Sequence, residues 1–189
     1  MRDRYAMSEQ KGWKNGAIRS AKEVARLAVF VAAAIGSQYA LSAVPFVEVV
    51  SLLFICFAFV FGVVRGVVAA VAFSLLRQLL FGFYPVVLIL YLIYFSMLSV
   101  AFGLLPKWCK WSGWKLLAVA TALAVVCAVC FTLLDNLLTP WYYAYTPKAA
   151  QMYFKASIPF LIGQTICVGV SVAGLFLPLT KALFFAKKA

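Results

Sequence analysis

The sequence predicts an all-α integral membrane protein, a compact bundle of six transmembrane helices with both termini in the cytoplasm. Of its 189 residues, 66% are hydrophobic and 12% are charged, and the mean hydropathy is +1.02. A soluble domain is about 45–50% apolar and about 25% charged, so this chain could not hide its apolar surface from water in one small fold. The apolar residues form six long runs without polar alternation, which favours helices over the strands of a membrane barrel. The composition therefore excludes an ordinary soluble enzyme, a disordered chain and a secreted disulfide scaffold.

Each predicted span is bounded by residues that end a helix or anchor it at the membrane surface. The six runs cover about residues 24–43, 46–64, 66–81, 86–105, 116–138 and 157–179. Pro45 ends the first run, a glycine and an arginine lie at the end of the second, and Pro85 separates the third from the fourth. A basic aromatic loop (107–115) and an aromatic loop (140–145) flank the fifth run, and a proline and a lysine close the sixth.

The lengths of these runs match a bilayer, with one exception. A helix of about 20 residues is about 30 Å long, which is the thickness of the hydrocarbon core. The third run, at about 66–81, would reach only about 24 Å. We therefore expect that helix to be tilted, sheltered by protein or continued by its loop.

The positions of Lys and Arg predict the orientation. With the N-terminus inside, 14 of the 17 basic residues face the cytoplasm, and only Arg77, Lys148 and Lys155 fall on the outer side. The formal net charge of +12 is thus explained by topology rather than by nucleic-acid binding. We divide the chain into basic cytoplasmic tails at 1–23 and 182–189 and a six-helix transmembrane domain at 24–181.

The sequence contains no pattern typical of an enzyme. It has no His, no Walker loop, no H-E-x-x-H and no G-x-S-x-G. We expect no catalytic residues, no cofactor and no metal site in this chain. Cys127-x-x-Cys130 has a redox spacing, but it lies in an apolar run, where cysteine usually behaves as a small hydrophobic residue.

Small residues recur every four positions in the first run. Ala28, Ala32, Gly36 and Ala40 would form one groove along a helix, where another helix can approach closely. The groove could pack against a neighbouring span of the same chain, or it could dock a separate subunit. Periodicity alone does not separate these interpretations.

Ionisable and polar residues lie in the predicted outer half of the membrane. Glu48 is at the start of the second run, Arg77 is near the end of the third, and Asp135 and Asn136 are at the end of the fifth. Charges at membrane depth are costly and are usually paired or functional. Arg77 could form a structural ion pair with Glu48 or Asp135, or these residues could form a polar cup for a solute.

Further residues are placed to line such a cup. Gln164 lies in the sixth run, with Ser157 and Ser171 on the same helical face, and Tyr84, Tyr91 and Tyr94 are placed to line one face of the fourth. The aromatic residues of the loop at 140–145 could cover the site or could form an interfacial belt. A shallow pocket with aromatic walls and a few polar groups suits a small, ring-containing solute.

The chain resembles the substrate-binding S components of energy-coupling factor (ECF) vitamin transporters. The resemblance covers about residues 22–185 and rests on a basic tail followed by A-R-L-A-V-F-V-A-A-A-I, then V-P-F-V-E-V-V-S-L-L, F-G-V-V-R-G, G-F-Y-P and S-I-P-F-L-I-G-Q-T-I-C. It implies a subunit in the cell membrane of a prokaryote, with the N-terminus inside, that binds a vitamin or related micronutrient from outside. It further implies docking on a T component driven by two ATPases.

The resemblance also implies roles for two parts of the chain. The A-x-x-x-A motif of the family contacts the T component, and it maps onto Ala28 and Ala32, with Gly36 extending the stripe. A loop at about 42–47 would help to close the site. The binding residues vary widely within the family, so Glu48, Arg77, Tyr84, Tyr91, Asp135, Asn136 and Gln164 are expected from their placement alone. A stand-alone transporter or channel, and a structural membrane protein, are the alternatives.

Overall fold

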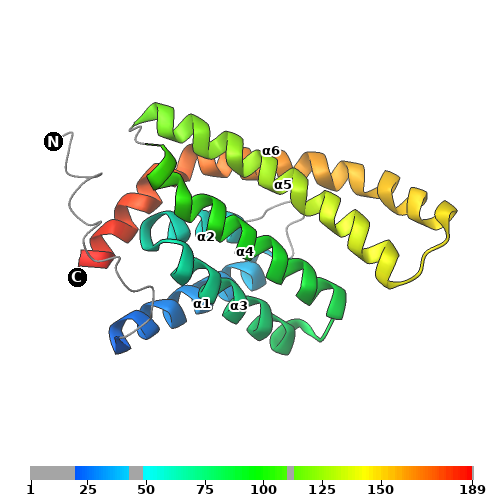
Figure 1. Cartoon of the computed structure of the whole chain (residues 1–189), viewed down its shortest axis with the longest axis horizontal. Coiled ribbons are helices and arrows are strands. Elements are labelled where there is room, and N and C mark those ends of the chain that lie inside the picture. The colour runs from blue at the N-terminus through cyan, green and yellow to red at the C-terminus, as the bar shows by residue number, and fades with distance from the viewer. Residues whose placement is uncertain (1–19, 43–48, 110–112, 189) are drawn as a thin grey trace.

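A computed structural model describes residues 20–42, 49–109 and 113–188 of the chain. This part of the chain is all-helical, without a strand, as the sequence predicts (Figure 1). Its helices are α1 (Ala21–Leu41), α2 (Val49–Phe61), α3 (Val63–Phe81), α4 (Pro85–Trp108), α5 (Trp114–Tyr142) and α6 (Pro147–Lys188).

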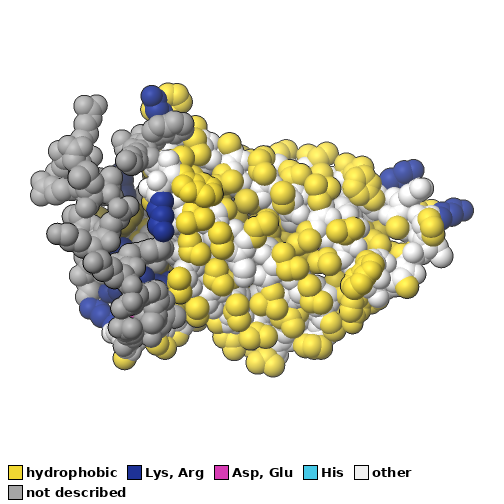
Figure 2. Space-filling view, viewed as in Figure 1, with side chains coloured by type: hydrophobic (Ala, Val, Ile, Leu, Met, Phe, Trp, Pro, Cys, Tyr) yellow, Lys and Arg dark blue, Asp and Glu magenta, His cyan; other side chains and the backbone are white. Residues whose placement is uncertain are grey.

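Five of the six helices are long and apolar enough to cross a membrane, all except α2. Figure 2 shows hydrophobic side chains over the middle of the molecule, with Lys and Arg gathered at its two ends. An apolar band between charged ends is the surface expected of a protein that spans a bilayer. The molecule is therefore a multi-pass membrane protein.

The short helix of the bundle is α2, and the prediction that residues 66–81 form a short span is wrong. Gly62 has a backbone φ of +87°, which favours glycine, and it separates α2 from α3. The break therefore falls earlier than expected, and α3 has 19 residues whereas α2 has 13. The predicted start of the second span, at 46–48, lies outside the described residues.

The burial of α2 explains why so short a helix is stable in this position. Ten of its 13 residues are buried, and it contacts α1, α3, α4 and α6. A helix that is surrounded by protein exposes few residues to lipid, so its length need not match the thickness of the bilayer. Shelter by surrounding protein, one of the three possibilities considered for the third span, is thus found for the second.

The last two helices are longer than predicted. α5 has 29 residues and continues through Pro140, and α6 has 42 residues and continues through Pro159 and Pro178. Proline is tolerated within transmembrane helices because neighbouring groups can satisfy the freed carbonyl. Figure 1 shows α5 and α6 side by side, with the turn that joins them extending beyond the ends of α3 and α4. Part of the aromatic loop expected at 140–145 is therefore helical.

Contacts at one end of the bundle join segments that are distant in sequence. Arg65, just after the α2–α3 junction, forms an ion pair with Glu23 at the start of α1. Arg26 donates a hydrogen bond to the carbonyl oxygen of Lys187 near the end of α6, at 3.2 Å. The beginning of α1, the α2–α3 junction and the end of α6 therefore lie together, as the alternating topology requires.

Two glycines bring α3 and α4 into close contact. A Cβ atom added at Gly103 would lie 2.6 Å from the backbone nitrogen of Val63, and one added at Gly66 would lie 2.9 Å from the Cβ of Ser99. Neither distance is compatible with van der Waals radii. Helices in lipid associate through such close packing, because burial from water no longer drives the contact.

We predict that Gly103→Ala lowers the free energy of unfolding by about 1–3 kcal/mol, because the added methyl group overpacks against the backbone of α3. Gly174→Ala is the matched control, since a Cβ there meets no atom within 4 Å. Thermal unfolding in detergent measures both variants. Equal melting temperatures for Gly103→Ala and the wild type would contradict the close approach.

Candidate functional site

A cavity of about 370 Å³ lies at the other end of the bundle, where the end of α1, the start of α2, the end of α3 and the first half of α4 meet α5 and α6. By the distribution of basic residues, this is the predicted outer end. The cavity is lined by Ser37, Gln38, Leu41, Ser42, Val49, Val50, Arg77, Phe81, Tyr91, Phe95, Phe131, Phe160 and Gln164. Its size and mixed lining are those of a site for a small molecule.

Arg77 is the cation of this cavity. Its guanidinium carbon lies 4.6 Å from the ring centroid of Tyr91 and 5.3 Å from that of Phe81. Both distances allow cation–π attraction, which is stronger away from water. The Nε and Nη1 atoms are buried and make no hydrogen bond within the described part of the chain.

Gln38 and Tyr91 join α1 to α4 across the cavity. The Gln38 side-chain amide donates to the Tyr91 hydroxyl at 3.3 Å, while the Gln38 Oε1 is buried without a described partner. The Tyr91 ring also stacks parallel to Phe73, at a centroid distance of 6.2 Å. Contacts on both sides hold this ring in place.

The neighbouring Gln78 braces the end of α3 that holds Arg77. Gln78 is buried, and its Oε1 accepts a hydrogen bond of 2.9 Å from the backbone N–H of Tyr84. This bond supports the α3–α4 turn, where Gly82 has a φ of +97°. The turn then fixes Arg77 and Tyr91 relative to each other.

The structure brings three of the predicted site residues together, namely Arg77, Tyr91 and Gln164, which all line the cavity. Tyr84 does not line it. It is the residue before α4, and its side chain is largely exposed. Glu48 lies outside the described residues.

Asp135 and Asn136 join α5 to α6 instead of lining the cavity. Asp135 accepts hydrogen bonds from Tyr153 at 2.7 Å and from Thr139 at 2.8 Å. Asn136 donates to the Ser157 hydroxyl at 2.8 Å. Asp135 does not pair with Arg77, so the ion pair considered for these two residues does not form.

The aromatic residues of 140–145 do not cover the cavity. They lie at the end of α5 and in the turn that follows it, where Tyr143 contacts both Tyr142 and Tyr145, and Tyr145 also contacts Tyr153. Trp141 is 77% exposed. Their position suits the membrane–water interface, the second interpretation considered for them.

Sequence reasoning did not select several residues that line the cavity, among them Gln38, Phe81, Phe95, Phe131 and Phe160. Gln38 could have been found from the sequence, because it is the single side-chain amide within the first apolar run. The phenylalanines offered no such signal, since the chain contains 17 of them and many belong to the buried core.

The small-residue stripe of α1 faces away from the rest of the chain. Ala28, Ala32 and Gly36 are exposed, and a Cβ at Gly36 would meet no atom within 4 Å. The opposite face, with Phe30 and Ala34, is buried. The stripe therefore does not pack against another helix of the described bundle, which is contrary to the internal-packing interpretation within those residues.

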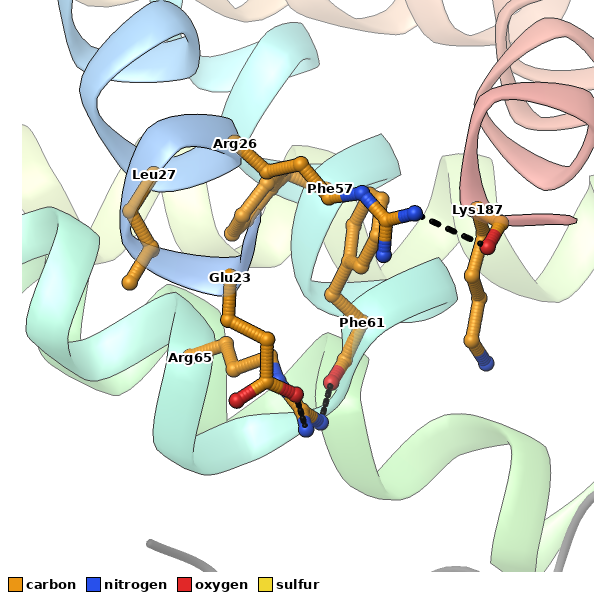
Figure 3. Close-up of a pocket in the computed structure, with 7 residues that line it drawn as sticks. All are labelled: Glu23, Arg26, Leu27, Phe57, Phe61, Arg65 and Lys187. Carbon is orange, nitrogen blue, oxygen red and sulfur yellow. Dashed lines mark hydrogen bonds and ion pairs between the residues drawn. The ribbon is translucent and has the colours of Figure 1, made fainter. Parts of the chain in front are cut away.

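A second cavity, of about 70 Å³, lies at the opposite end and is too small for a metabolite. Figure 3 shows its polar residues bonded to one another and to backbone. Besides its pairing with Glu23, Arg65 donates to the carbonyl oxygen of Phe61 at 3.3 Å, and Lys187 donates to that of Val60 at the same distance. These contacts tie α1, α2 and α6 together and indicate a structural role.

No protein-family model matches this sequence, and no curated protein or solved structure is significantly similar to it. The assignment of a function therefore rests on the chemistry of the cavity and on the resemblance described above.

We predict that the cavity is open to water from outside the cell. In a variant whose five native cysteines are replaced by alanine, Gln164→Cys should react within minutes with a membrane-impermeant maleimide added to intact cells. Ser74→Cys, at a fully buried position of α3, should react about tenfold more slowly or not at all, because thiol reactivity follows exposure. Labelling of Gln164→Cys from the cytoplasmic side alone would reverse the predicted orientation.

Proposed function

We propose that the chain is the substrate-binding S component of an ECF-type importer. In this role it captures a vitamin or related small micronutrient from outside the cell. It then delivers the solute inward by docking on a T component driven by two ATPases. The proposal also places the chain in the cell membrane of a prokaryote, with its N-terminus inside.

The observation that supports this role most directly is the cavity at the predicted outer end. Arg77 and Gln38 present buried polar atoms there without described partners, among aromatic side chains. Unpartnered polar atoms in a buried site are costly, and a bound solute would satisfy them.

The outward face of α1 supports the need for a partner. Its small side chains leave a shallow surface over which a second transmembrane helix could approach closely. The chain also lacks a nucleotide-binding loop, so the energy for uptake would come from another subunit. Both features agree with a binding subunit that acts within a larger importer.

The proposal is tested by purifying the tagged chain from its native membranes in mild detergent and identifying what is retained by mass spectrometry. We expect a T-like membrane subunit and two P-loop ATPases. Recovery of the chain alone, in detergent shown to preserve such complexes, together with uptake that does not need ATP, would favour a stand-alone transporter instead.

We predict that Ala32→Trp lowers ATP-dependent uptake about tenfold or more, because the indole ring blocks the close helix approach that small residues permit. Solute binding to the isolated variant should stay within about twofold of wild type, since the exposed stripe does not line the cavity. Val170→Trp on α6 is the control, because Val170 is 68% exposed and lies on a different helix. Equal loss of binding and uptake in Ala32→Trp would exclude the docking role.

A further inference from the structure

The polar atoms of the larger cavity define a chemical pattern for its occupant. Two donor nitrogens of Arg77, Nε and Nη1, have no described partner, and neither has the acceptor Oε1 of Gln38. Buried guanidinium N–H groups that lack an acceptor are unfavourable until one is supplied. The occupant should therefore present acceptor oxygens to Arg77 and an N–H group to Gln38.

The charged residues of the described part of the chain indicate that the ligand of this cavity is an anion. Its two carboxylates are occupied elsewhere, Glu23 with Arg65 and Asp135 with Tyr153 and Thr139. No acidic residue lines the cavity in the part of the chain that the structure describes. An anionic group on the ligand would balance the charge of Arg77 in a site with aromatic walls.

The walls restrict the rest of the ligand. The guanidinium carbon of Arg77 lies within 4.6 Å of the Tyr91 ring centroid and 5.3 Å of the Phe81 ring centroid, so these two rings form the wall of the cavity next to the cation. Phe95, Phe131 and Phe160 add apolar surface that suits a planar ring. A single cation favours one carboxylate over a phosphate, which carries more charge and more acceptor oxygens. A volume of about 370 Å³ suits one or two rings.

We propose that this cavity binds a planar ring compound that carries one carboxylate and one ring N–H group. Arg77 binds the carboxylate, and the ring N–H donates a hydrogen bond to Oε1 of Gln38. The inference rests on the proposed function in one respect, that the cavity is a solute-binding site. It adds the charge and the shape of the solute.

The proposal is tested with the full-length chain in nanodiscs of phosphatidylcholine, which contain no anionic lipid. The probes are indole-3-carboxylate, 1-naphthoate, their carboxamides and the cation tryptamine, with binding measured by calorimetry. We expect a carboxylate to bind about 10- to 150-fold more tightly than its carboxamide, which is the range for a hydrogen bond to a charged group. A carboxamide or tryptamine that binds as tightly would overturn the proposal.

Substitutions test whether Arg77 and Gln38 cause the preference for a carboxylate with a ring N–H group. Arg77→Gln should remove the advantage of the carboxylate, and Arg77→Lys should keep part of it, since lysine retains the charge without the planar fork. Gln38→Leu should weaken indole-3-carboxylate about 2- to 10-fold but leave 1-naphthoate, which lacks an N–H, unchanged. Arg26→Gln, at the opposite end of the bundle, is the matched control and should bind as the wild type does. Melting temperatures verify that each variant is folded, and an unaltered preference in folded Arg77→Gln would overturn the assignment.

A second measurement separates this inference from the proposed function. The wild-type chain is loaded with a small-molecule extract of the host cells and washed, and the retained compound is sorted by ion exchange. An anion that Arg77→Gln does not retain supports the proposal. A neutral or cationic compound would overturn it and leave the solute-binding role intact. If nothing is retained and no probe binds, both the inference and the solute-binding role fail.

Discussion

The ring of Phe54 contacts Phe30 on α1, Phe73 on α3 and Phe95 on α4, at centroid distances of 5.1, 5.3 and 4.6 Å. These edge-to-face and tilted contacts join three helices, α1, α3 and α4, to α2. Since lipid removes the usual hydrophobic attraction between helices, such shape-matched contacts must provide much of the packing energy. The central position of α2 thus follows from its large, mostly apolar side chains, and the helices that it contacts are arranged around it.

The cavity is built on this aromatic cluster. Phe95 belongs to both, and Tyr91 stacks on Phe73 of the cluster while its ring lies against Arg77. Below them, Ser51 of α2 and Tyr94 of α4 share a buried hydrogen bond of 3.2 Å. Contacts on their far sides hold the walls of the cavity in a defined arrangement.

Arginine side chains lie at both ends of the bundle, but their surroundings differ. At the end near Glu23, the arginines are satisfied by a carboxylate and by backbone carbonyls, so they fasten helices together. At the other end, Arg77 has aromatic neighbours and no described acid. A satisfied charge contributes to structure, whereas an unsatisfied one in a cavity is available to a ligand. This contrast is the physical basis for the functional proposals.

The sequence by itself determined that the chain is a helical membrane protein, because composition and apolar run length depend on the bilayer alone. It also placed Arg77, Tyr91 and Gln164 in the half of the membrane where they meet. Only the tertiary structure decided that Asp135 and Asn136 join α5 to α6, that α2 is the short helix, and that Gln38 faces Tyr91. Partner choice depends on how helices rotate and pack, and residue spacing within one helix does not contain that information. For the same reason the outward direction of the Ala28–Ala32 stripe became clear only once the neighbours of α1 were in place.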